Sequence, residues 1–253
     1  MTYQEFTGSE QARRRYWARS FLGWHTIGGA EPNEGHHAVA ALAERGLVTG
    51  VITQNVDGLH AAAGTAGTVE LHGNLARVRC LQCGEVTGRP ELQARLEAAN
   101  PAWTAEVSAH YADGDVEVED GALVGFAVPV CLGCGGTLKP DVVYFGEPVP
   151  ADRVRAAFAV VDAARSLLVL GSSLTVMSGY RFVLHAVKRG LPVAIVNLGP
   201  TRGDRHADVR VDAPLGAALS AVNTRVRVGA RPASGRTSVT PSRAAAMAVP
   251  SSP

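Results

Sequence analysis

Short apolar runs, each stopped by small or polar residues, recur in the second half of the chain. Residues 166–170 (SLLVL) precede Gly-Ser-Ser, and residues 192–196 (PVAIV) precede Asn-Leu-Gly. A continuous apolar run of this length is typical of a parallel strand that is covered on both faces. Residues 178–189, between the two runs, have a helical pattern that Gly190 and Pro192 close. The pattern therefore predicts a right-handed βαβ unit.

A third strand is predicted at residues 47–53, after a helix at residues 36–45. Ligands of open parallel sheets bind beyond the carboxyl ends of the strands. All three predicted strands end in small or polar residues, which favours a nucleotide-type cleft in an α/β fold. These residues are Gln54, Asn55 and Asp57 after the third strand, Ser172 and Ser173 after the first, and Asn197 after the second.

The composition narrows the class of protein. The chain has 253 residues, 46% of them hydrophobic, which is enough for a sizeable core. Its 24 basic and 23 acidic residues leave a formal charge of +1, which excludes a polybasic nucleic-acid coat. No apolar run reaches the roughly 18 residues of a membrane span, and no signal peptide is recognisable. We expect a cytoplasmic protein whose last segment, residues 229–253, is a disordered tail rich in small residues, Pro and Arg.

The four cysteines form two C-x-x-C pairs, and a glycine follows each pair. Zn²⁺ takes four thiolates in a tetrahedron, and each pair can supply two of them from one tight turn. A pair of redox dithiols is the alternative, but such motifs open a helix after a strand, whereas these lie in Gly-rich turns. The spacing predicts a closed structural zinc site, in a module at residues 80–138 with a long insert. The expected ligands are Cys80, Cys83, Cys131 and Cys134.

His72 is the histidine with the best context for catalysis. It interrupts a short apolar strand, in the sequence VELHGN at residues 69–74, just before the zinc module. A histidine there can face a cleft between two domains, and its ordinary pKa suits a general base near neutrality. The other histidines are expected at the surface (His25, His36, His37, His110 and His206), on a helix in a structural role (His185), or in a packing or capping role (His60).

The motifs, taken in order, resemble those of the sirtuins, which are NAD⁺-dependent protein deacylases. The resemblance covers roughly residues 15–219. RYWAR at residues 15–19, LKPDVVYFGE and NLGPTR look most like the class II, mitochondrial-type branch. The ordered motifs are TQNVDGLH (53–60), ELHG (70–73), the two C-x-x-C pairs, LKPDVVYFGE (138–147), GSSL (171–174) and IVN (195–197).

The resemblance implies a Rossmann-like sheet domain at residues 1–79 and 139–228, with a cleft between it and the zinc module. Residues 1–35 would be a helical cover in an alternative division. The resemblance also implies a reaction in which the acyl-lysine oxygen attacks the nicotinamide ribose and expels nicotinamide. The products are free lysine, nicotinamide and O-acyl-ADP-ribose.

The resemblance also assigns site residues. His72 is the implied general base, and the four cysteines hold one structural Zn²⁺. NAD⁺ is the co-substrate. The implied NAD⁺ contacts are Gln54, Asn55, Val56, Asp57, Gly171, Ser172, Ser173, Asn197, Leu198, Gly199 and Leu215, and the implied substrate-peptide strand is Val142, Val143, Tyr144, Phe145 and Gly146.

One part of the family pattern is absent. Sirtuins begin with a strand and a Gly-Ala-Gly-x-Ser loop that holds the pyrophosphate, and this sequence has neither. Either the true start lies upstream of Met1, which we favour, or the chain is a truncated homologue. The alternatives to a deacylase are a protein ADP-ribosyltransferase using the same cleft and an inactive homologue that acts as a zinc or binding module. We expect acyl-lysine proteins as partners, no specific nucleic acid or membrane, and a monomer.

Overall fold

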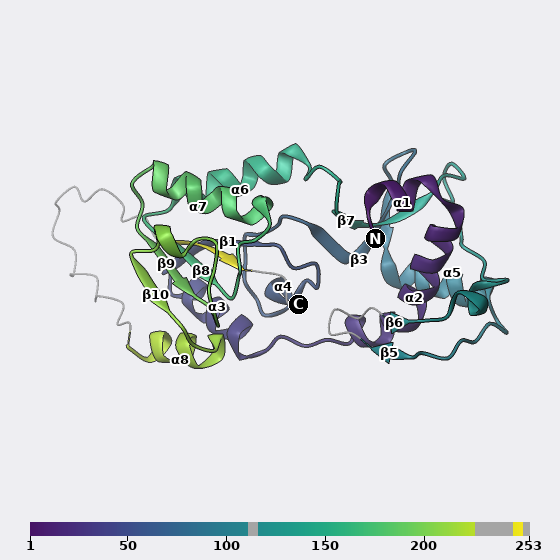
Figure 1. The fold of residues 1–253 in the computed structure, drawn as a ribbon, viewed down its shortest axis with the longest axis horizontal. Helices are drawn as coiled ribbons and strands as arrows, with labels where there is room; N and C mark the ends of the chain where they lie inside the picture. The colour runs from purple at the N-terminus through teal and green to yellow at the C-terminus, as the bar shows by residue number, and fades with distance from the viewer. Residues whose placement is uncertain (111–115, 226–244, 250–253) are drawn as a thin grey trace.

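Two units with separate cores make up the structure, a computed structural model that describes residues 1–110, 116–225 and 245–249. Figure 1 shows the larger unit around a sheet on one side and the smaller unit on the other, with β3 and β7 running between them. The expected α/β fold with a parallel sheet and a smaller cysteine-bearing unit is confirmed.

The larger unit contains a six-stranded sheet whose neighbouring strands are all parallel. Three of its strands lie within one residue of the bounds that the apolar runs predict. In spatial order the strands are β10 (Val209–Val211), β9 (Val193–Val196), β8 (Leu167–Leu170), β11 (Ala245–Val249), β1 (Val48–Thr53) and β2 (Thr68–Glu70).

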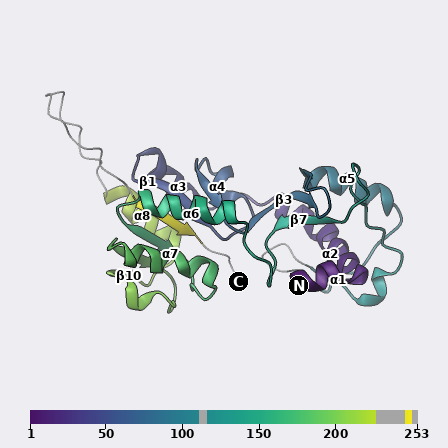
Figure 2. The same cartoon turned by 90° about the horizontal axis from the view of Figure 1, so that it is seen from above.

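Helices cover both faces of this sheet, as a parallel sheet requires. On one face, α6 (Ala151–Ala163) and α7 (Met177–Lys188) share a core with β8 and β9. On the other face, α3 (Glu34–Glu44) packs with α8 (Leu215–Arg225). Figure 2 shows the same two layers from above. The short helix α4 (Leu59–Ala62) and the 3₁₀ turn at Asp204–His206 connect strands.

The strand β11 differs from the expectation of a disordered tail at residues 229–253. It pairs with β1 on one side and β8 on the other, in the middle of the sheet. Both neighbours present rows of backbone donors and acceptors that need partners, and a short segment without proline or charge can satisfy them. The rest of the predicted tail, residues 229–244 and 250–253, lies outside the described residues.

The smaller unit is built on the antiparallel strands β4 (Val86–Gly88), β3 (Gly73–Cys80) and β7 (Leu138–Val142). The helix α5 (Arg89–Ala99) packs on them. The long insert adds a small hairpin, β5 (Ala109–His110) and β6 (Val116–Glu117), and the 3₁₀ turn Asp120–Leu123.

The N-terminal helices belong to the core of the smaller unit. The helices α1 (Tyr3–Gly8) and α2 (Glu10–Gly28) bury Phe6, Trp17 and Ala18 in the same cluster as residues of β3, α5 and β7. The indole of Trp17 also donates a hydrogen bond to the carbonyl of Leu138 at 3.2 Å. The domain division expected from the sequence, with residues 1–79 in the sheet domain, therefore differs from the packing. The aromatic side chains of these helices find their apolar partners in the cysteine module.

Within the described residues, none of the helices is both long enough and apolar enough to cross a membrane.

Candidate active site and metal centre

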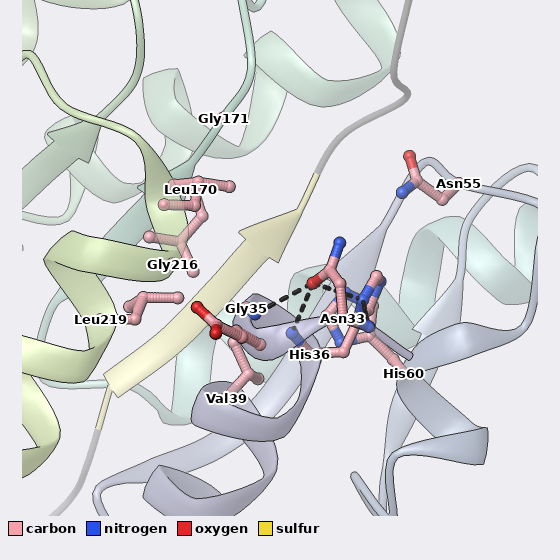
Figure 3. A pocket seen from close by; sticks show the side chains of 12 residues that line it. Asn33, Gly35, His36, Val39, Asn55, His60, Leu170, Gly171, Gly216 and Leu219 are labelled. Atoms are coloured by element: carbon pink, nitrogen blue, oxygen red, sulfur yellow. Dashed lines mark hydrogen bonds between the residues drawn. The ribbon is translucent and has the colours of Figure 1, made fainter. Parts of the chain in front are cut away.

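A pocket of about 450 Å³ lies at the carboxyl ends of β1 and β8, between α3, α4 and α8. Figure 3 shows the residues that line it, which come from α3, α4, α8 and the ends of β1 and β8. Parallel strands bring their carboxyl ends to the same edge, so residues distant in sequence meet here. Of the predicted NAD⁺ contacts, Asn55, Gly171 and Leu215 line this pocket.

The side of the pocket formed by α4 and the loop after β1 carries polar atoms that have no partner among the described residues. The Oδ1 of Asn55 and both ring nitrogens of His60 are buried and accept or donate no hydrogen bond within the structure. Buried polar groups are nearly always paired, so this wall suits a ligand with hydroxyl or amide groups. Burial lowers the pKa of His60 to about 4, which keeps its ring neutral at physiological pH.

Asn33 and His36 complete this wall at the start of α3. The side chain of Asn33 caps the helix by accepting hydrogen bonds from the N–H groups of Gly35 and His36, at 2.9 and 3.2 Å. His36 was expected at the surface, and this is wrong: its ring is buried and lies 4.8 Å from that of His60. Its place in the first turn of α3 turns it inward against α4, and this burial lowers its pKa.

The remaining predicted NAD⁺ contacts lie at the same sheet edge but do not line this pocket. Ser172 and Asn197 are buried in tight turns after β8 and β9. The hydroxyl of Ser172 accepts from the Leu174 N–H, and the Asn197 amide donates to the carbonyls of Leu198 and Gly199. Ser173 is in the same turn as Ser172 and contacts Thr175 through its hydroxyl.

The segment after β1 turns sharply toward α4. Asp57 accepts a hydrogen bond from the N–H of Leu59 at 2.9 Å. Val56 lines a second pocket, on the side of the smaller unit. Gln54 donates to the hydroxyl of Ser178 at 3.1 Å.

His72 lies between β2 and β3, where the chain passes from the larger unit to the smaller one. Its Nε2 forms a 2.9 Å hydrogen bond with the hydroxyl of Ser178, the hydroxyl to which Gln54 donates. Its backbone carbonyl accepts a hydrogen bond from the N–H of Val143 at 2.8 Å. His72 therefore joins the polar end of β1 to the predicted peptide strand.

Burial lowers the pKa of His72 below its ordinary value of 6.5. A backbone hydrogen bond with Gln54 partly opposes this shift, while the positive charges of Arg181 and Arg153 add to it. The ring is therefore neutral at pH 7 and can accept a proton, which is what a general base requires.

The predicted peptide strand continues β7. Val142 pairs with Gly73 in the sheet, and the segment turns at Gly146. The carbonyl of Phe145 accepts a hydrogen bond from the N–H of Tyr3, so the start of α1 lies against this segment. The buried ammonium of Lys139 forms a 2.9 Å ion pair with Glu147, which fixes both ends of the segment.

The four cysteines meet at the end of β3. Their sulfur atoms all lie within 4.8 Å of one another, with 3.5 Å between Cys80 and Cys134 and 3.7 Å between Cys83 and Cys131. Four thiolates around Zn²⁺ at 2.3 Å would be about 3.8 Å apart. The cluster therefore matches the size of a tetrahedral zinc site.

Two further features fit a metal at this cluster. A hydrogen bond from the backbone of Cys83 lowers the pKa of the Cys80 thiol to about 6, which favours the thiolate that a metal needs. Hydrogen bonds with Glu85 and with Cys80 raise the pKa of the Cys131 and Cys134 thiols as long as no metal is bound. A Cβ atom at Gly136 would lie 2.8 Å from the sulfur of Cys80 and 3.0 Å from that of Cys134. Glycine at this position therefore leaves room for the sulfur cluster.

Sequence reasoning missed several residues of the site. Ser178 was placed at the start of a helix and given no role, and Asn33 was not considered. The sequence PNEGHH at residues 32–37 does carry a signal for Asn33, because asparagine before a helical pattern is a strong N-cap. Nothing in the sequence near Ser178 indicates that it meets residues 54 and 72.

Comparisons with known proteins agree with this geometry. The Sir2 family profile matches residues 1–178. A protein of Streptomyces coelicolor named NAD-dependent protein deacetylase 1 is 58% identical over 231 residues, which cover 90% of this chain and 77% of the relative. One of Mycobacterium avium with the same name is 52% identical, covering 84% of this chain and 76% of the relative.

Solved structures agree as well. A Sir2 structure with a p53 peptide and NAD⁺ superposes with a TM-score of 0.68 at 29% identity, over 87% of this chain and 80% of that one. A Sir2 structure bound to an acetylated peptide gives the same values. These relatives are bacterial and do not support the class II, mitochondrial-type branch. On the profile match and the two relatives, the chain belongs to the Sir2 family, the sirtuins.

Proposed function

We propose that this chain is an NAD-dependent protein-lysine deacylase, with His72 as the general base. The proposal rests on the family and on the relatives that are named NAD-dependent protein deacetylases. The acyl group would pass to ADP-ribose, with release of nicotinamide. Acyl-lysine proteins are the substrates.

The observation that carries the proposal is the position of His72. Its Nε2 faces Ser178 beside the polar end of β1, and its carbonyl is bonded to Val143 of the peptide strand. A base at this junction lies between the side where a nucleotide would bind and the side where a peptide would add. The lowered pKa gives it the protonation state that the role needs.

The residues around the pocket have chemistry that suits NAD⁺. When bound, NAD⁺ supplies the ribose carbon that takes the acyl oxygen and the nicotinamide that leaves. Asn55 and His60 offer buried polar atoms that lack protein partners, and Gly171 allows close approach of a ligand at the end of β8. His72 would accept a proton from a ribose hydroxyl. The segment after β7 would pair with the peptide main chain, a mode that reads little sequence.

The test uses an acetyl-lysine peptide and the zinc-loaded full chain. We expect nicotinamide release that requires both NAD⁺ and the peptide. His72→Ala should reduce the rate by at least about a hundredfold, in line with the loss of a general base. Full activity in His72→Ala would reject the assignment. Mass spectrometry separates the alternative, because an ADP-ribosyltransferase leaves ADP-ribose on the acceptor protein.

Three finer points are proposals of their own. The class II branch rests on sequence segments such as RYWAR at residues 15–19. A cytoplasmic location fits cysteines held as thiolates by a metal rather than as disulfides, and cell fractionation tests it. A monomeric state is tested by light scattering.

A further inference from the structure

The hydroxyl of Ser178 is shared by two residues of the candidate active site. Ser178 lies in the first turn of α7 and is only 8% exposed. Its Oγ lies 3.1 Å from the side-chain nitrogen of Gln54 and 2.9 Å from Nε2 of His72. Among the described residues, this hydroxyl has no other hydrogen-bond partner. Ser178 therefore connects the polar end of β1 to His72.

The chemistry of the three groups sets the direction of these hydrogen bonds. The amide nitrogen of Gln54 can only donate, so the oxygen of Ser178 accepts from it. The single hydrogen of the hydroxyl then remains, and Nε2 of His72 is the acceptor within reach. If Nε2 carried a proton, the hydroxyl would receive two donors and its own hydrogen would find no acceptor in the described part of the chain. Full use of the donors therefore leaves Nε2 without a proton.

The other ring nitrogen of His72 agrees with this direction. Burial is the largest influence on the pKa of His72 and lowers it, whereas a hydrogen bond with the backbone of Gln54 raises it. A hydrogen bond raises the pKa of a histidine when the ring is the donor, so the carbonyl of Gln54 accepts from the ring. Since Nε2 faces Ser178, the donor is Nδ1. The main chain and the side chain of Gln54 thus favour the same tautomer from opposite sides of the imidazole.

Gly179 gives the side chain of Gln54 the room that this arrangement needs. A Cβ atom at Gly179 would lie 2.5 Å from Oε1 and 2.8 Å from Cδ of Gln54. Both distances are too short for a carbon atom, so a larger residue would push Gln54 away from Ser178. The sequence Ser-Gly at the start of α7 therefore supplies both the hydroxyl and the space beside it.

We propose that Ser178 is a positioning residue that holds His72, before NAD⁺ binds, in the tautomer with its proton on Nδ1 and a bare Nε2. The inference rests on the proposed function, in which His72 is the general base, and adds the residue that prepares this base. A neutral histidine accepts a proton only at its bare nitrogen, and its hydrogen bonds decide which nitrogen is bare. Ser178 acts through His72 and takes no proton itself.

A blocking role for Ser178 makes the opposite prediction. Nε2 has a single lone pair, so Ser178 must leave it before His72 can accept a proton from a ribose hydroxyl. This exchange replaces one neutral hydrogen bond with another, and Ser178 keeps its bond to Gln54, so the exchange costs little. Presetting therefore outweighs blocking. Without the hydroxyl, fewer NAD⁺-free molecules hold His72 in the competent tautomer, and kcat/KM falls in proportion.

Nuclear magnetic resonance of the zinc-loaded full chain without NAD⁺ tests the tautomer independently of turnover. Long-range proton–nitrogen correlations of protein labelled in its histidines distinguish a protonated from a bare ring nitrogen, and His72→Ala assigns the signals. We expect wild-type His72 to carry its proton on Nδ1 at neutral pH, and Ser178→Ala to move a substantial share of it to Nε2. A proton on Nε2 in the wild type would overturn the inference. So would an unchanged, bare Nε2 in folded Ser178→Ala.

Steady-state kinetics with an acetyl-lysine peptide measures the consequence. Ser178→Ala should lower kcat/KM for NAD⁺ about three- to tenfold, the worth of one neutral hydrogen bond. The value of kcat should change little, because at saturation every His72 is already in the competent tautomer. Ser178→Thr keeps a hydroxyl and should restore most of kcat/KM. Ser220→Ala removes an exposed hydroxyl from α8 and should change neither kcat/KM nor the tautomer.

Zinc content and thermal unfolding verify that each variant folds. A higher kcat/KM in Ser178→Ala, or an equal loss in folded Ser178→Thr, would contradict the positioning role.

These readouts separate the inference from the proposed function. Turnover that requires His72, together with a proton on Nε2 in the wild type, refutes the role of Ser178 and leaves the deacylase intact. Full activity in His72→Ala refutes His72 as the base, while the resonance experiment still decides whether Ser178 sets the tautomer.

Discussion

The neutral state of His72 follows from its burial, and it has a consequence for the pH dependence of the reaction. The base is active when unprotonated, so kcat/KM should fall only when the pH drops through the pKa of this ring. Burial and two nearby arginines hold that pKa below 6.5. We expect the acid limb of the pH–rate profile to have its midpoint below 6.5. Arg181→Gln removes a positive charge and should move this midpoint to higher pH. A wild-type midpoint above 7 would contradict the assignment of His72 as the base.

His60 should make the protein less stable in acid. Its pKa is about 4 in the folded chain, against 6.5 as its ordinary value. Between these values the unfolded chain binds a proton that the folded chain does not, so the free energy of unfolding falls as the pH falls. The full shift corresponds to about 3 kcal/mol. Urea unfolding at pH 6.5 and 4.5 should show that the free energy of unfolding falls less in His60→Phe than in the wild type. The exposed His25→Phe is the control and should lose as much as the wild type. An unchanged loss in His60→Phe would refute this.

At the residue level, the sequence identified the residues that lie in motifs with a recognisable spacing. The cysteines and His72 stood out because each lies in a short motif with few competing interpretations. Ser178 and His36 did not, because the role of Ser178 depends on a contact with His72, 106 positions away, and that of His36 on burial by another element. Such contacts leave no local pattern.

Gly73 is the first residue of β3, directly after His72, and it shows how backbone geometry constrains an element. Its φ of +90° is a conformation that side chains disfavour, and a Cβ atom there would lie 1.8 Å from the carbonyl oxygen of Asp141. Gly73→Ala should therefore lower the free energy of unfolding by about 3 kcal/mol or more. Gly64 has a φ of +89° but open space around it, so Gly64→Ala should cost only about 1 kcal/mol. Equal losses in denaturant unfolding would contradict the steric argument.

At the element level, the βαβ unit was predictable because buried strands and the amphipathic α7 have strong patterns. The helix expected at residues 178–189 is α7, and the strands on either side of it are β8 and β9. The strand β11 was not predictable, since the sequence AAMAV carries no alternation and lies in a segment of tail-like composition. Its place is set by the two strands that it pairs with.

On the scale of the whole molecule, the shared core of the smaller unit couples the cysteines to the N-terminal helices. Structural zinc affinity contributes directly to folding. Zinc removal by a chelator should therefore increase hydrogen exchange in β3, β7, α1 and α2 together, while β8, β9 and α7 keep their protection. Protein purified without chelator should contain about one zinc per chain. Loss of protection confined to the cysteine turns, or spread evenly over the chain, would contradict this coupling.

The division of the molecule into its two units was the feature least predictable from the sequence. The motifs gave the family and the α/β class, but the assignment of α1 and α2 depends on which apolar surfaces meet. Phe6 and Trp17 face residues more than sixty positions along the chain. The second pocket is lined by α2 together with β3 and β7, so its shape depends on that packing.

The amounts of the reaction products test the proposed chemistry most directly. Zinc-loaded protein, an acetyl-lysine peptide and NAD⁺ are incubated, and the products are quantified by mass spectrometry. We predict free lysine peptide, nicotinamide and O-acetyl-ADP-ribose in equal amounts, none of them without NAD⁺ and almost none with His72→Ala. Deacetylated peptide accompanied by free acetate in the absence of NAD⁺, or no product from protein with its zinc bound, would contradict it.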